Sequence, residues 1–230
     1  MKKQDYLFIL FALCLFLPFI FCRPLTDLFF DLTAQHGMWM SFVKFGILAT
    51  MGEMIGLRIA KGCYTAPDFG LLPRAVVWGI LGVGINAAMI IFSKGTPCLL
   101  EYCGMTDAVA VFTAPHFTMA KLFVAFCISV AMNTIFAPIF MTLHKITDTH
   151  IIQQHGRLAS LWTPIPFGTI IPNLNWNVQW NFVFKRTIPL FWYPAHTITF
   201  ILPPSLRVLF AALLGVALGL ILAIAARKKE

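Results

Sequence analysis

Long apolar runs separated by short polar segments dominate the pattern of this chain. Most runs are close to the length of about 20 residues that a membrane-spanning helix requires. The runs are Tyr6–Cys22, Met38–Ala60, Pro73–Phe92, Phe117–Leu143, Thr187–Leu202 and Ser205–Ala226. The segment Leu161–Phe184 is too interrupted by Gly and Pro to be a clean span. The pattern predicts an all-α integral membrane protein, a bundle of about six transmembrane helices with short loops.

The first run follows Lys2 and Lys3 and ends in PFIFCRP, which contains no small-residue cleavage site. We therefore expect an uncleaved anchor helix. In the next segment, Arg23–His36, four apolar residues recur at helical spacing while two aspartates lie off that face. This pattern predicts a helix at the membrane interface. The expected organisation is an anchor and interfacial segment over 1–36 and a transmembrane bundle over 37–230.

Composition agrees with this pattern, since 59% of the residues are apolar and 11% are charged. The net charge is +8, and the basic residues that produce it lie at the ends of the apolar runs. A nucleic-acid-binding site would instead gather them on one solvated face. With six alternating spans and a cytoplasmic N-terminus, the outer basic residues number four: Arg23, Lys94, Lys121 and Arg207. The inner ones number twelve: Lys2, Lys3, Arg58, Lys61, Arg74, Lys145, Arg157, Lys185, Arg186, Arg227, Lys228 and Lys229. Basic residues prefer the cytoplasmic side, so both termini are expected there.

Cys98 and Cys103 are the only close pair among the six cysteines, in the segment CLLEYC. The orientation above places them on the outer side, where an oxidising compartment would allow a small disulfide loop. The alternative is two unpaired thiols on a short interfacial turn.

Glu53 is the only acidic residue in a confident span. A charge near the bilayer centre costs at least about 2.5 kcal/mol, so the carboxylate needs a partner. Lys44 is on the opposite face of the same helix, and the partner must come from another helix, from water or from a proton. Gly52 and Gly56 flank Glu53 and would let helices approach closely. Two roles are therefore open for Glu53: a structural contact between helices, or a position in the lining of a pore.

The stretch IPLFWYPAHTITFILPPSLRVLF contains prolines, a histidine and an arginine, which are unfavourable in a membrane helix, within an apolar run. On a helical wheel Trp192, His196 and Thr199 share one face, which we expect to turn toward an internal cavity. The alternative is a packed helix with one hydrogen-bonded histidine. We expect Pro194 to bend this helix, because it removes a backbone donor. Pro203 and Pro204 should end it.

A third group of residues lies in the predicted inner loop, HKITDTHIIQQH. If the preceding helix continues, His144, Asp148 and His155 fall on one face. Two imidazoles and a carboxylate can hold non-haem iron or zinc. A solvated helix face explains the same spacing.

The stretch WYPAHTITFILPPSLRVLF resembles the signature of the peroxisomal membrane protein family of about twenty-two kilodaltons, which includes Mpv-seventeen. Where that family has a Trp-Pro pair followed by Gln, Asn-Phe, Pro and Arg, this chain has Trp192, His196, Thr199, Phe200, Pro204 and Arg207, with Arg207 one position early. Tyr193 stands at the place of the family proline, and Pro194 follows it. The match is looser upstream, where Gly52 and Glu53 resemble a Gly-Asp motif.

The resemblance implies an all-helical membrane protein proposed to form channels for small solutes. We expect a channel or transporter-like pore lined by Glu53, Trp192, His196 and Thr199, with neither enzymatic activity nor a cofactor. The alternatives are a non-transporting scaffold or binding protein and a membrane-embedded metalloenzyme. The expected partners are the lipid bilayer and a small solute, with a homo-oligomer open and nucleic acid excluded. The N-terminus is typical of a bacterial inner-membrane anchor, the alternative being an organelle membrane.

Overall fold

The structure is a computed structural model that describes the backbone of residues 2–227 and the side-chain surroundings of residues 2–219. Every regular element in these residues is helical. In chain order they are α1 (Lys3–Phe21), α2 (Arg23–Gln35), α3 (Gly37–Lys61), α4 (Leu71–Tyr102), α5 (Ala108–Thr113), α6 (Met119–Gln153), η1 (Leu158–Leu161), α7 (Phe167–Asn173), α8 (Trp176–Val178), η2 (Gln179–Trp192), α9 (Tyr193–Ile201) and α10 (Pro204–Arg227).

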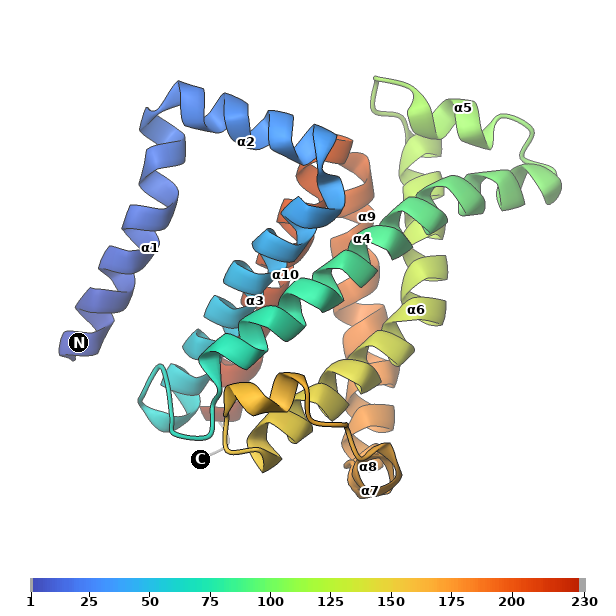
Figure 1. The fold of residues 1–230 in the computed structure, drawn as a ribbon. Coiled ribbons are helices and arrows are strands. Elements are labelled where there is room, and N and C mark those ends of the chain that lie inside the picture. Colours follow the sequence, from blue (N-terminus) through green and yellow to red (C-terminus); the bar gives the residue numbers. More distant parts are fainter. Residues whose placement is uncertain (1, 228–230) are drawn as a thin grey trace.

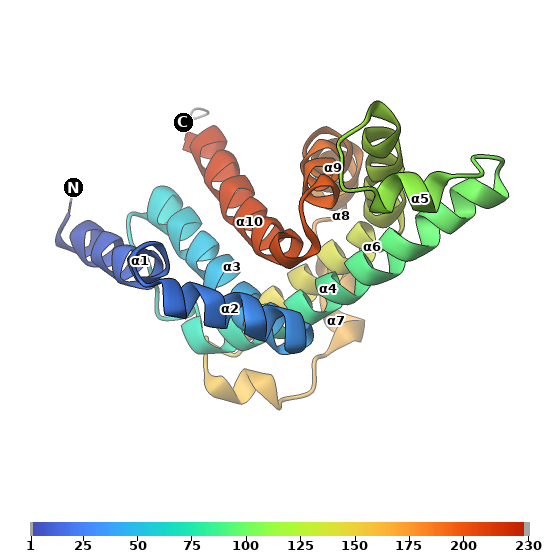
Figure 2. The same cartoon turned by 90° about the horizontal axis from the view of Figure 1, so that it is seen from above.

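The long helices run between two sides of the molecule, and the short ones lie at its ends (Figure 1). Helices α1, α3, α4, α6, η2–α9 and α10 follow the long direction, α2 and α5 lie at one end, and α7 lies at the other. Helix α10 returns to the side on which α1 begins. Seen from above, α10 leans against α3 and diverges from α9 along its length (Figure 2).

Four of the described helices, α1, α3, α4 and α6, are long and apolar enough to cross a membrane. The architecture is therefore that of a multi-pass, all-helical membrane protein. The predicted count of six spans stays a prediction, because α9 has nine residues and the described apolar part of α10 is Pro204–Gly219.

The predicted fifth span begins earlier than the sequence pattern indicated. A π-helix, η2, leads directly into α9, and the Tyr193 amide donates to the Ile188 carbonyl five residues back. Wider turns of this kind can satisfy backbone groups that a proline frees, and η2 contains Pro189. Pro194 lies in the first turn of α9. The change from π-helical to α-helical turns thus falls just before Pro194, and the bend expected there stays a prediction.

The predicted end of this helix at the Pro203–Pro204 pair is confirmed. Helix α9 ends at Ile201, Leu202 is extended with φ −66° and ψ 154°, and α10 begins at Pro204. A residue before proline is pushed out of the helical region. Arg207 then donates from Nε to the Leu202 carbonyl and from Nη2 to the Phe200 carbonyl, both at 3.0 Å, and so satisfies acceptors at the end of α9.

The small disulfide loop expected between Cys98 and Cys103 is not formed, because α4 continues as far as Tyr102 and includes Cys98. Both cysteines are free and exposed, so the structure contains no disulfide between them. A spacing of five residues places two side chains about 140° apart around a helix, which separates the thiols. The predicted span ended at Phe92 because hydropathy falls there, but the backbone remains helical.

Glycines in the middle of α3 and α4 allow these two helices to approach closely. A Cβ atom on Gly82 would lie 2.4 Å from Phe45 Cβ, and one on Gly46 would lie 2.9 Å from the Ala75 carbonyl oxygen. Gly52 similarly meets α10, because an added Cβ would lie 3.0 Å from Val216 Cα. Gly56 does not pack as expected, since nothing lies within 4 Å of its added Cβ.

The N-terminal helices join the bundle through a few polar contacts. Most apolar side chains of α1 are exposed, and its Asp5 pairs with Arg58 of α3 at 2.7 Å. Helix α2 crosses one end of the molecule without a buried residue (Figure 1). Its position at the membrane interface stays a prediction. Helix α2 also provides two partners for the buried Lys44 ammonium. The Lys44 Nζ donates to Thr33 Oγ1 at 2.8 Å and lies 4.6 Å from the Phe29 ring centroid.

Candidate functional site

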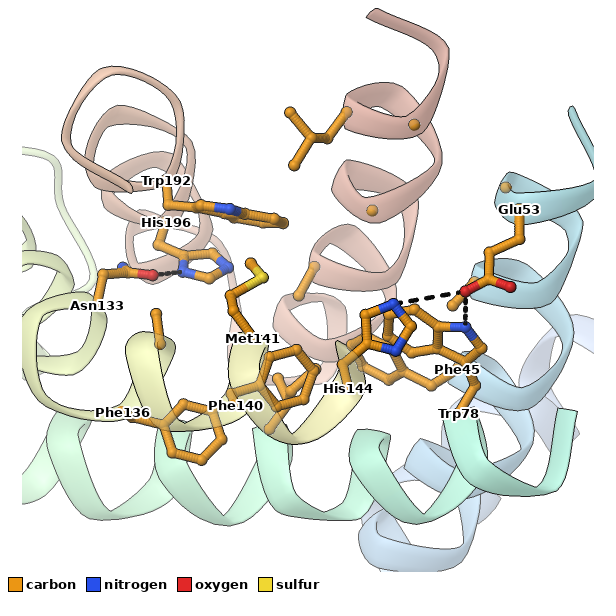
Figure 3. Close-up of a pocket in the computed structure, with 18 of the residues that line it drawn as sticks. Phe45, Glu53, Trp78, Asn133, Phe136, Phe140, Met141, His144, Trp192 and His196 are labelled. Carbon is orange, nitrogen blue, oxygen red and sulfur yellow. Dashed lines mark hydrogen bonds and ion pairs between the residues drawn. The ribbon is translucent and has the colours of Figure 1, made fainter. Parts of the chain in front are cut away.

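A cavity of about 300 Å³ lies between the α3–α10 pair and the α6–α9 pair, with α4 alongside (Figure 3). Three of the four predicted pore residues, Glu53, Trp192 and His196, line it. The fourth, Thr199, does not, because its side chain is fully buried and its hydroxyl donates to the Ala195 carbonyl at 3.0 Å. A hydroxyl bonded to its own helix in this way is a structural group.

The walls between the two polar ends are apolar and rich in aromatic rings. Phe45, Phe136 and Phe140 line the cavity together with Met132 and Met141. Such a surface, with a few convergent polar groups, is typical of small-molecule sites. On the α10 side the wall includes two glycines, Gly215 and Gly219, and no atom lies within 4 Å of a Cβ added to Gly215.

Glu53 forms one polar end of the cavity and has partners from two other helices. Its Oε2 accepts from Arg74 Nη1 at 2.5 Å, and its Oε1 accepts from Trp78 Nε1 at 2.9 Å. His144 of α6 also lies near, with its Nε2 3.5 Å from Oε1 (Figure 3). The expected partner from another helix is thus the Arg74 guanidinium of α4, the next helix along the chain.

Arg74 is buried and joins three helices. The same Nη1 also contacts Asp148 of α6, and the Arg74 Nε donates to the Phe69 carbonyl. Lys145 Nζ lies 3.4 Å from the other Asp148 oxygen on the exposed side. Two carboxylates therefore face one buried guanidinium and one half-exposed ammonium, and the formal charges of this cluster balance.

His196 forms the other polar end and contacts α6 and η2. Its Nδ1 lies 3.1 Å from Asn133 Oδ1 of α6, and its ring centroid lies 5.0 Å from that of Trp192 of η2, with the two rings tilted by 39°. The Trp192 Nε1 is buried without a hydrogen-bond partner among the described residues. Glu53 and His196 thus line one cavity from opposite ends and do not touch each other (Figure 3).

The predicted metal ligands are not brought together. Helix α6 ends at Gln153, and His155 lies beyond it in a turn with φ 54°, where it faces Asp68 at 3.5 Å. His144 and Asp148 instead point toward the Glu53–Arg74 pair. Among residues 2–227, no cluster of three or more His, Cys, Asp or Glu side chains suits a metal ion. The chain turns out of the helix before His155, which removes the shared face.

Sequence reasoning missed four residues of this site: Arg74, Trp78, Asn133 and His144. Asn133 is a polar residue in a predicted span, a type that usually faces the interior of a bundle. That signal could have identified it. The sequence pattern indicates orientation for Arg74 and metal binding for His144, because it does not show which helices pack together.

No match was found in comparisons of this chain with protein-family models, with curated proteins or with solved structures.

Proposed function

We propose that the protein admits small solutes into the central cavity and passes them across the membrane. The observation that supports this proposal best is that Glu53 and His196, ionisable residues on different helices, line the same cavity. Ionisable side chains within membrane helices usually mark solute or ion pathways. We include in this proposal that the chain resembles the Mpv-seventeen family, whose members are proposed to form channels.

The packing of the helices supports a pathway of this kind. Helix α10 contacts α3 closely, α6 contacts α9 closely, and the cavity lies between these pairs. Relative movement of the two pairs would widen the cavity on the side where α10 diverges from α9 (Figure 2). The Glu53–Arg74–Asp148 cluster links α3, α4 and α6, and its opening would connect the cavity to the side predicted to be cytoplasmic.

The alternative is a membrane scaffold or binding protein that transports nothing. It is favoured by the number of contacts that Glu53 already makes, since a fully partnered carboxylate can be purely structural. We retain the expectation of a non-enzymatic protein without a cofactor, located in a bacterial inner membrane with cytoplasmic termini. The separation of His155 from His144 and Asp148 argues against the metalloenzyme alternative.

Flux through liposomes separates transport from scaffolding. Purified full-length protein would be reconstituted and its uptake of glycerol, urea and potassium chloride measured by stopped-flow light scattering. We expect flux of at least one of these solutes above that of protein-free liposomes. Gly215→Phe should reduce it to the protein-free level, because Gly215 lines the cavity and no atom lies within 4 Å of its added Cβ.

Gly84→Phe is the matched control for that variant. Gly84 also has no atom within 4 Å of an added Cβ, but it does not line the cavity. Its flux should equal that of the wild type. Absence of flux for all three solutes would favour the scaffold. Wild-type flux in Gly215→Phe would contradict a pathway through this cavity.

A further inference from the structure

The orientation of the Asn133 side chain is set by its neighbours on α6 and α9. Its Nδ2 donates to the Ser129 carbonyl at 2.8 Å and lies 3.3 Å from Ser129 Oγ. That hydroxyl donates its own proton to the Tyr193 carbonyl at 2.7 Å. A flipped amide would direct its oxygen at two groups that can only accept there. The Asn133 Oδ1 therefore faces His196 Nδ1.

The orientation of Asn133 determines the tautomer of His196. An amide oxygen only accepts hydrogen bonds, so the proton of the neutral imidazole must be on Nδ1. The Nε2 atom then has a free lone pair. No described side chain or backbone group donates to this atom, and the His196 ring lines the cavity (Figure 3). This end of the cavity consequently presents an acceptor that requires a donor.

The remaining surface of the cavity defines the rest of the ligand. Trp192 lies beside His196, and Met132 and Ala137 also line the cavity. These surfaces favour an apolar body. The charges at the other end balance within the Glu53–Arg74–Asp148–Lys145 cluster, so no uncompensated charge attracts an ion. A volume of about 300 Å³ is at the lower limit of small-molecule sites.

We propose that the cavity binds a small neutral solute with an apolar body and an N–H or O–H group that donates to His196 Nε2. This inference rests on the proposed function for its biological meaning, because the bound solute would be the one transported. The binding chemistry itself follows from Ser129, Asn133 and His196. A buried acceptor left without a donor costs free energy, so the site should discriminate against solutes that lack one.

Indole and indene test this donor requirement, because they have nearly the same shape and only indole has an N–H. Binding of each would be measured by isothermal titration calorimetry to the full chain in lipid nanodiscs, with protein-free nanodiscs subtracted. We expect indole to bind about three- to tenfold more tightly than indene. In His196→Phe, which keeps an aromatic ring, the two affinities should become equal while indene still binds.

Two further variants make the result specific to this hydrogen bond. Asn133→Leu removes the acceptor that holds the proton on Nδ1, and it should also lower the preference for indole. Thr134→Val is the control, because Thr134 is the neighbouring residue but pairs with the Tyr193 hydroxyl at 2.7 Å on the exposed side. This variant should keep the wild-type preference.

The inference is overturned if neither probe binds, if wild type binds both equally, or if His196→Phe keeps the preference. These outcomes do not depend on transport, since binding is measured at equilibrium without a gradient. Selective binding without liposome flux would leave the ligand class intact and contradict only the proposed function. Flux without selectivity would contradict only the ligand class.

Discussion

Arg74 Nη1 lies 2.5 Å from Glu53 Oε2 and also contacts Asp148, so one guanidinium joins carboxylates from α3 and α6. This contact explains how the bundle tolerates two acidic side chains in or beside membrane helices. The desolvation cost of each carboxylate is offset by a shared cation that is itself buried. It also couples the cavity end at Glu53 to the packing of three helices.

The first prediction concerns the loss of this shared cation. Arg74→Met leaves Glu53 and Asp148 without their buried partner, and we expect it to lower the free energy of unfolding by about 3–5 kcal/mol. Denaturant unfolding in detergent would measure the change. Lys145→Met is the control and should cost less than about 1 kcal/mol, because Lys145 is half-exposed. Equal effects of both variants would contradict a stabilising role specific to Arg74.

The second prediction compares two glycines of α4. In Gly82→Ala the new Cβ would lie 2.4 Å from Phe45 Cβ, and relieving this overlap should destabilise the protein by about 1–3 kcal/mol. Gly84→Ala meets no atom within 4 Å and should be neutral or stabilising by up to about 1 kcal/mol, because alanine favours helix. Thermal unfolding in one detergent tests both. A similar loss in the two variants would show that close packing of α3 and α4 is unimportant.

The third prediction concerns the orientation in the membrane. Cys98 and Cys103 lie at the end of α4, and both are exposed. In right-side-out vesicles, a variant that retains only Cys98 should react with a membrane-impermeant maleimide. A cysteine-free variant with Gln153→Cys, at the end of α6, should react only after the membrane is permeabilised. Labelling of both sites from the same side would refute the alternating topology.

The fourth prediction concerns the junction between α9 and α10. Arg207→Met removes both hydrogen bonds to the Leu202 and Phe200 carbonyls, and the loss should be about 1–3 kcal/mol. Arg207→Lys, which keeps a charge but not the two-pronged geometry, should fall between wild type and Arg207→Met. Chemical unfolding in detergent measures the order of the three proteins. A methionine variant as stable as wild type would show that these carbonyls are satisfied otherwise.

Local patterns in the sequence determined the helical class and several helix boundaries. Apolar runs predict membrane helices because lipid cannot hydrogen-bond a peptide group and the backbone must satisfy itself. The ending of α9 before Pro203 and the formation of a separate helix α2 follow equally from nearby residues. The same local reasoning showed that Glu53 requires a partner and that Lys44, on the opposite face, is not that partner.

Tertiary structure alone decided which groups meet. Arg74, the partner of Glu53, comes from another helix, and the partner of His196 is Asn133, 63 positions away. These contacts depend on the rotation and crossing of packed helices, which no periodicity along one segment reveals. The sequence pattern also grouped His155 with His144 on one helical face, and only the end of α6 at Gln153 separates them. Long-range packing therefore determined the chemistry of the cavity, whereas local hydropathy determined the helices that enclose it.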